Sequence, residues 1–252
     1  MEILDDARRL ASRLLFGKGG RKHRLHDQPG PLPGFLIIGA QKSGTTTLYA
    51  MLGTHPQLTR PTDKEVHYFS LHYERGEEWY RRHFKGDIAF EASPYYIFHP
   101  AVPERIRATV PNAKLIAILR DPVQRSVSHY FHSVLKGHET LPMLEALRAE
   151  ETRTGDYSHQ HHTYVARSRY LEQLERWAGF DLLVLSNREL REKPDETLAR
   201  ACRHIGVDPI PAPPLERNVG RKGDVPAEAR QFLVERLAGE KEAVEQRYGI
   251  VL

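Results

Sequence analysis

The chain has 252 residues, 40% of them hydrophobic, which suits one compact domain with a buried core rather than a disordered or fibrous chain. Its 37 Lys and Arg residues against 33 Asp and Glu give a formal charge of +4, which suits anionic ligands but does not indicate a nucleic-acid partner. The single cysteine, Cys202, excludes an internal disulfide, and no apolar run is long enough to cross a bilayer. We therefore expect a soluble, cytoplasmic protein, and the sequence does not determine its oligomeric state.

The first 33 residues combine a helical pattern with a basic linker. Apolar residues recur at helical spacing over residues 3–16, and the stretch from Lys18 to Arg24 is basic. Such a helix docks on its domain or frays in solvent more often than it lies on a membrane surface. We therefore expect residues 1–33 to form an N-terminal helix and linker, and residues 34–252 to form the folded domain.

Strands and helices alternate from residue 35 onward. Apolar runs predict buried strands, the last two of them weaker, at 35–38, 114–119, 181–185, 58–60 and 88–91. Periodicity and capping signals predict helices at 45–52, 123–135, 141–151, 164–177, 194–205 and 226–248, with a flexible polar loop after residue 151. This alternation predicts a single α/β domain with a central parallel sheet flanked by helices.

The segment Gly39-Ala-Gln-Lys-Ser-Gly-Thr-Thr46 joins the first predicted strand to the first predicted helix. Backbone N–H groups and the helix dipole can hold a phosphate at such a place. The glycine spacing matches the triphosphate loop GxxxxGK[ST], but Thr45 stands where that loop has its lysine, and Lys42 lies inside the loop. The usual lysine reaches the β- and γ-phosphates, so a triphosphate is disfavoured. Lys42 would instead lie near a 5′-phosphate and its leaving oxygen, together with the candidate binding residues Ser43, Gly44, Thr45, Thr46 and Thr47.

Two segments together resemble one known family. Residues 35–48, FLIIGAQKSGTTTL, look like the 5′-phosphosulfate-binding loop of the sulfotransferases that use 3′-phosphoadenosine 5′-phosphosulfate (PAPS). Residues 118–128, ILRDPVQRSVS, are similar to the family's 3′-phosphate motif, which implies that Arg120 and Ser128 hold that phosphate. Read without the family, Arg120 could pair with an acid and Ser128 could be a neutral helix residue. The resemblance implies a P-loop-like sulfotransferase fold, PAPS as co-substrate, 3′-phosphoadenosine 5′-phosphate (PAP) as product, and no metal.

Two further segments narrow the resemblance to the carbohydrate sulfotransferases. Lys64-Glu-Val-His-Tyr-Phe69 resembles a KExHFF-like segment of the Golgi heparan-sulfate enzymes and their bacterial relatives, and Glu91-Ala-Ser-Pro-Tyr95 resembles their short strand and Ser-Pro turn. The resemblance runs from about residue 35 to residue 223. It implies a sugar hydroxyl or amine as the acceptor group, although a glycosylated or other small natural product stays open.

The same resemblance assigns catalytic roles. Lys42 would neutralise the leaving oxygen, with Lys64 assisting, and Glu65 would act as general base with a pKa raised for that task. His67 is the competing base, because imidazole titrates nearer neutral pH than a carboxylate. In an extended segment His67 would lie on the same side as Glu65, so their spacing leaves the choice between them open.

A basic loop with glycines, Arg217-Asn-Val-Gly-Arg-Lys-Gly223, follows a proline-rich segment. It resembles the late loop that closes over the nucleotide in the family, which implies that Arg221, Lys222 and Gly223 approach the 3′-phosphate. A solvated basic turn is an equally open interpretation.

Residues 129–162 are rich in histidine and could be mistaken for a metal site. The histidines are irregularly spaced and lack an HExxH or paired ligand pattern. We expect an acceptor-facing or mobile surface there and no metal.

Taken together, these patterns predict a PAPS-dependent sulfotransferase. A small-molecule P-loop kinase is one alternative, but it would need a lysine directly after Gly44. A non-catalytic nucleotide- or glycan-binding module is another, against which the presence of Lys42 and Glu65 weighs.

Overall fold

The computed structural model describes residues 25–214 and 223–252. These residues form a five-stranded parallel sheet in the order β2-β3-β1-β4-β5. Its strands are β1 (Phe35–Gly39), β2 (Leu58–Thr59), β3 (Ile88–Ala92), β4 (Lys114–Leu119) and β5 (Leu182–Ser186). The central strand β1 has Phe35 opposite Phe90 of β3 on one side and opposite Lys114 of β4 on the other. The predicted central parallel sheet is confirmed.

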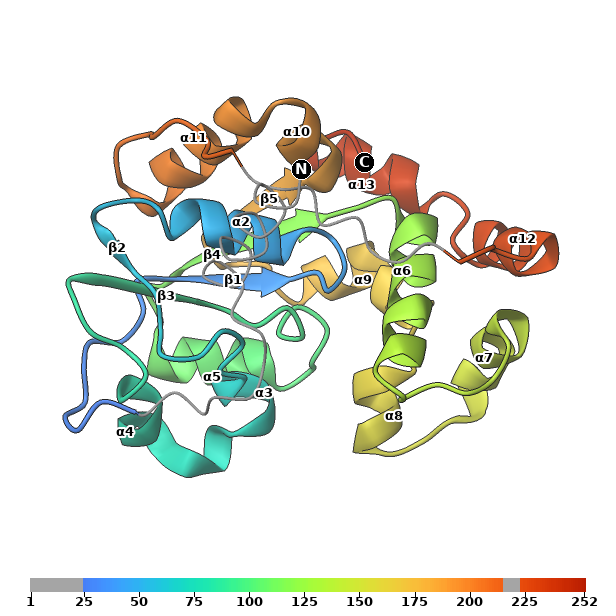
Figure 1. The fold of residues 1–252 in the computed structure, drawn as a ribbon, viewed down its shortest axis with the longest axis horizontal. Helices are drawn as coiled ribbons and strands as arrows, with labels where there is room; N and C mark the ends of the chain where they lie inside the picture. Colours follow the sequence, from blue (N-terminus) through green and yellow to red (C-terminus); the bar gives the residue numbers. More distant parts are fainter. Residues whose placement is uncertain (1–24, 215–222) are drawn as a thin grey trace, which may run out of the picture.

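Helices cover both faces of the sheet (Figure 1). Phe35 and Ile37 of β1 face the apolar cluster that includes α2 (Thr45–Leu52), α10 (Asn187–Glu192) and α11 (Pro194–Ile205). Leu36 and Ile38 face the opposite cluster, which includes α3 (Tyr68–Leu71), α4 (Gly76–Arg81), α5 (Val102–Thr109), α9 (Tyr170–Glu175) and α13 (Glu240–Tyr248). Successive side chains of a strand point to opposite faces, so a strand covered on both sides is apolar throughout.

A third apolar cluster lies beyond the carboxyl end of the sheet. It joins α6 (Pro122–Leu135), α7 (Met143–Ala149) and α12 (Ala227–Arg236). Figure 1 shows the arrow of β1 pointing toward α6, with α7, α8 (Asp156–His161) and α12 on the same side of the molecule. Ligands of open parallel sheets bind outside the carboxyl ends of the strands, so this edge is where a site is expected.

Several helix boundaries agree with the signals in the sequence. Helix α2 spans the predicted residues 45–52, and α6 begins at Pro122. The Asp121 side chain caps α6 by accepting a hydrogen bond from the backbone N–H of Gln124 at 2.8 Å. Helix α11 ends at Gly206, whose φ of 88° lies in the left-handed region that favours glycine.

Two predicted helices and one predicted loop were wrong in extent. The segment 226–248 is interrupted at Gly239, whose φ is 77°, and so forms α12 and α13. The segment 164–177 contains only a 3₁₀ turn, η3 (Ala166–Ser168), and α9, because the backbone leaves the helical region at Arg169. The region after residue 151 is not simply a loop, since α8 forms there. The other 3₁₀ turns are η1 (Tyr73–Arg75) and η2 (Glu150–Thr152).

Of the predicted N-terminal helix and linker, only the end of the linker can be compared with the structure. The helix expected over 3–16 lies outside the described residues. Residues 25–33 of the linker pack on the domain, since the N–H groups of His26 and Gly30 donate to the carbonyls of Arg82 and Arg81. Across the ranges 25–214 and 223–252, no helix has the length and hydropathy to cross a membrane.

Candidate active site

The loop between β1 and α2 has the geometry of an anion cradle. The N–H of Ala40 donates to the carbonyl of Ile118 at 2.9 Å, which fixes the start of the loop against β4. Lys42 and Gly44 both adopt left-handed backbone conformations, with φ of 70° and 102°. Helix α2 begins directly after Gly44, so its free N–H groups point back into this loop. Ser43 and Thr45 are buried within it.

Gly44 is required by both its conformation and its surroundings. A Cβ atom there would lie 2.5 Å from Nδ2 of Asn187, at the start of α10. We expect Gly44→Ala to lower the free energy of unfolding by about 1–2 kcal/mol, the cost of a left-handed non-glycine residue, plus the cost of displacing Asn187. Urea denaturation measures this loss. Gly137→Ala is the matched control, because Gly137 has φ of 73° but open space around it. Equal losses in the two variants would show that the Asn187 contact costs nothing.

Lys42 lies in a strongly cationic neighbourhood. Burial lowers the pKa of its ammonium group, and Arg120 lowers it further. Lys64 and Arg125 act in the same direction, and Glu65 is the carboxylate that opposes them. A cluster of this kind has unbalanced positive charge, which an anionic ligand would neutralise.

Lys64, Glu65 and His67 form one connected group beside the loop. Nζ of Lys64 donates to Oγ1 of Thr46 at 2.7 Å and to Oε1 of Glu65 at 3.1 Å. Nε2 of the His67 ring lies 3.6 Å from Oε2 of Glu65. The backbone N–H of His67 donates to Oγ of Ser93 at 3.0 Å. The structure thus brings these predicted catalytic residues together and joins them to the start of α2, beside the loop that holds Lys42.

Two expectations for this group were wrong. The segment is not extended, because Glu65 and His67 have φ of 64° and 55°, and His67 precedes the first residue of α3. The pKa of Glu65 is not raised either. Burial alone would raise it, but the contacts with His67 and Lys64 lower the pKa to about 2. Glu65 and His67 are therefore a contacting pair in this structure, not two independent candidates.

Arg120 and Ser128 flank the same edge of the sheet. Arg120 follows β4 and donates from Nη2 to Oε1 of Gln124 at 3.0 Å. Burial lowers its pKa, and the nearby cation Arg191 of α10 adds to this. Ser128 is half-buried on α6, six residues after Pro122 and so about 9 Å along the helix. Arg120 thus belongs with Lys42, Lys64 and Arg125 to a cationic edge at the carboxyl end of the sheet. Ser128 lies about two turns away on the adjoining helix α6.

The late basic loop can be compared only in part. Arg221 and Lys222 lie outside the described residues. Gly223 lies against α6, since a Cβ atom there would be 2.5 Å from Cε1 of Phe131. Thr47 is half-buried in the first turns of α2.

The histidines of 129–162 lie in several different environments. His129 is buried and packs edge-on against Tyr164 with ring centroids 5.0 Å apart. Burial lowers the pKa of His132 to about 4, Lys42 contributes in the same direction and Glu65 opposes them, so His132 lies within electrostatic range of both. His138 and His161 instead stack on each other at 3.9 Å. Within the described ranges, no cluster of three or more His, Cys, Asp or Glu side chains could hold a metal ion.

Sequence reasoning missed several residues of this site. Asn187 and Arg191 become candidate site residues once β5 is placed, because both follow the carboxyl end of this strand. Arg125 of α6 is fully buried and donates to Oγ of Ser168. Glu91 of β3 has a buried carboxyl whose pKa is raised by burial to about 7, beside the hydroxyls of Tyr96, Ser93 and Tyr80. Both lie in segments that resemble the family, residues 118–128 and 91–95, but nothing in the local sequence marks their charges as buried.

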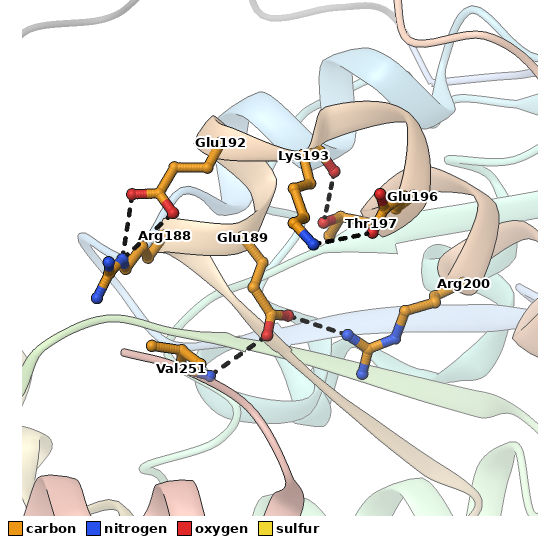
Figure 2. A pocket seen from close by; sticks show the side chains of 8 residues that line it. All are labelled: Arg188, Glu189, Glu192, Lys193, Glu196, Thr197, Arg200 and Val251. Carbon is orange, nitrogen blue, oxygen red and sulfur yellow. Dashed lines mark hydrogen bonds and ion pairs between the residues drawn. The ribbon is translucent and has the colours of Figure 1, made fainter.

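A separate pocket of about 240 Å³ lies between α10, α11 and Val251 near the C-terminus. Figure 2 shows its acidic and basic side chains joined in pairs, including Arg200 with Glu189 at 2.9 Å. The residues that line it include none of the predicted site residues. Its charges balance one another, unlike those around Lys42.

Comparison with known proteins places this geometry in one family. The family model described as the sulfotransferase domain matches residues 32–219. Bifunctional heparan sulfate N-deacetylase/N-sulfotransferase 4 of Mus musculus is 33% identical over 199 residues, which are 71% of this chain and 23% of the mouse protein. Membrane-associated sulfotransferase kil1 of Dictyostelium discoideum is 43% identical over 121 residues, which are 44% of this chain and 26% of that protein. The chain thus spans about a quarter of these two relatives.

A solved bacterial structure agrees with the family model. The sulfotransferase from Alicyclobacillus acidocaldarius is 28% identical, and it superposes with a TM-score of 0.75 over 88% of this chain and 98% of its own. The family match covers most of the described sheet together with the loop at Lys42, the segment at Glu65 and the motif at Arg120. The chain therefore belongs to the sulfotransferase family.

Proposed function

We propose that this protein transfers a sulfuryl group from PAPS to a hydroxyl or amine of an acceptor. The observation that carries this proposal is the environment of Lys42, which lies inside the anion-binding loop among Arg120, Lys64 and Arg125, with Glu65 as the opposing carboxylate. PAPS carries negative charge on its 5′-phosphosulfate and on its 3′-phosphate, which suits both ends of this cationic edge.

The transfer needs one bond to form and one to break. The acceptor oxygen or nitrogen attacks the sulfur in line with the bridging oxygen, a new bond to sulfur forms, and the bond from sulfur to the bridging oxygen breaks. The released PAP gains negative charge at its 5′-phosphate, where Lys42 and the N–H groups of α2 stabilise it. Glu65 takes the proton of the acceptor group, because it is the carboxylate joined to this cluster.

Donor binding would change the proton affinity of Glu65. In the present arrangement Lys64 divides its hydrogen bonds between Thr46 and Glu65. An anionic sulfuryl group beside Lys64 competes for its ammonium group, which would remove one of the contacts that lower the Glu65 pKa. Glu65 then becomes a stronger base when the donor is in place.

The acceptor is proposed to be a carbohydrate. The mouse relative and a human relative, heparan sulfate glucosamine 3-O-sulfotransferase 3B1, are named for heparan sulfate; the human one is 32% identical over 187 residues. De-N-sulfated heparan sulfate offers both amines and hydroxyls and is therefore the acceptor to try with radiolabelled PAPS. A cytoplasmic location stays a prediction.

Calorimetric binding of PAP tests the donor assignment. We expect tight PAP binding by the wild type, weak binding of ATP, and a Kd for PAP about 10- to 100-fold higher in Arg120→Ala, as for a lost charge-assisted hydrogen bond. Arg203→Ala is the matched control, because Arg203 is exposed on α11. A preference for ATP, or no PAP binding, would contradict the proposal.

A further inference from the structure

Arg167 is a buried cation that lies between α8 and residues 40–44, the loop proposed above to bind the donor and called the donor loop from here on. Only 3% of the surface of Arg167 is exposed to solvent. Nη1 donates to Oε1 of Gln41, the residue before Lys42, at 2.8 Å. Nη2 donates to the carbonyls of His159 and Gln160 at 2.9 and 2.7 Å. One guanidinium group therefore bonds the donor loop and the C-terminal part of α8 at the same time.

Aromatic rings fix the orientation of this guanidinium. Arg167 lies over the rings of Tyr95 and Phe98, with 4.4 and 5.0 Å to the ring centroids. His159 of α8 stacks on Phe98 at 4.6 Å and hydrogen-bonds the Tyr95 hydroxyl. Cation–π contacts of this kind strengthen when the cation is removed from water. The loop, α8 and the turn after β3 are thus joined through Arg167.

The charge of Arg167 is costly where it lies. Burial lowers its pKa to about 9, and Tyr95 and Glu150 oppose this only in part. None of the ion pairs found among the described residues includes Arg167. An apolar side chain of similar volume would fill such a space at lower cost. What the guanidinium provides, and an apolar side chain could not, is the set of fixed hydrogen bonds to Gln41 and α8.

We infer that Arg167 is a positioning residue that couples the donor loop to α8, so that donor binding orders the helix and the helix holds the loop ready for the donor. This inference rests on the proposed function, because it takes PAP as a ligand of the loop. Helix α8 carries Tyr157, 54% exposed, and His161 at the face expected to meet the acceptor. The coupling is reciprocal, so weakening it also weakens PAP binding.

Hydrogen exchange of the full chain with and without PAP tests this coupling. In the wild type we expect PAP to slow the exchange of amides 157–162 by about tenfold. In Arg167→Lys and in Gln41→Leu the slowing should fall below about twofold, and the Kd for PAP should rise about tenfold. Gln41→Leu leaves the bonds from Arg167 to α8 in place, so it separates coupling from the folding of the helix. Arg169→Lys, at an exposed neighbouring residue, should behave as the wild type.

The possible results separate the inference from the proposed function. If PAP binds but leaves the exchange of 157–162 unchanged in the wild type, the coupling does not exist. Equal protection in the wild type and in Gln41→Leu would also overturn it, because the bond would then carry no coupling. If calorimetry shows that the wild type does not bind PAP, the proposed function fails and the inference fails with it.

Discussion

Replacing Lys42 by methionine should lower kcat for sulfuryl transfer by about 10²- to 10³-fold, as expected when one group that stabilises developing negative charge is lost. Lys42 lies inside the donor loop, where the bridging oxygen of the donor would gain charge as the bond to sulfur breaks. Because this charge is greater in the transition state than in the bound donor, the Kd for PAP should change less than kcat. Turnover of radiolabelled PAPS with de-N-sulfated heparan sulfate measures the rate.

Lys85→Met is the matched control for this experiment, since Lys85 is exposed in the loop before β3. It should retain the rate of the wild type. A loss of rate in Lys42→Met that is matched by an equal loss of PAP affinity would contradict the assigned role. Lys42 would then bind the donor equally in the ground state and the transition state.

Replacing Glu65 by glutamine should lower kcat by about 10²- to 10⁴-fold, the usual contribution of a general base. The change keeps the size of the side chain but removes its capacity to accept the proton. PAP affinity should not fall, because the change removes a negative charge that repels the anionic PAP. Glu78→Gln on α4 is an exposed control. If Glu65→Gln keeps the rate while His67→Gln loses it, His67 is the base.

The same residue predicts a pH dependence. A general base must be unprotonated, so the rate of the free enzyme falls as pH falls through the pKa of that base. The pKa of Glu65 is lowered to about 2. The acid limb of the pH–rate profile should therefore lie below the pH at which an ordinary glutamate titrates. Lys64→Met removes one cause of this lowering, so the acid limb of kcat/KM should move to higher pH. An unchanged acid limb in Lys64→Met would show that another group sets it.

Much of the fold follows from local sequence. The apolar runs at 35–38 and 114–119 place two central strands, since only a strand buried on both faces is continuously apolar over so short a length. Gly53 and Pro122 mark helix ends correctly because their backbone constraints act within one or two residues. Helix breaks that depend on longer-range contacts were missed, as at residue 169, where two buried neighbours take a 3₁₀ turn.

The candidate site divides in the same way. Lys42, Glu65 and Arg120 could be named from the sequence, because each belongs to a short motif or follows a predicted strand. Arg167 could not be named, because its partner Gln41 lies far away along the chain. The direction of the Glu65 pKa shift was also predicted wrongly, since it depends on the positions of the His67 and Lys64 side chains.

The sequence by itself determined the parallel α/β architecture, the glycine-containing loop after the first strand and the candidate residues, because backbone conformation and side-chain type are local properties. Only the tertiary structure decided that Glu65 and His67 contact each other, that α8 forms after residue 151, and that Arg167 joins this helix to the donor loop. Burial, charge and hydrogen bonding between distant segments set these features. They depend on distances that exist only after the chain has folded.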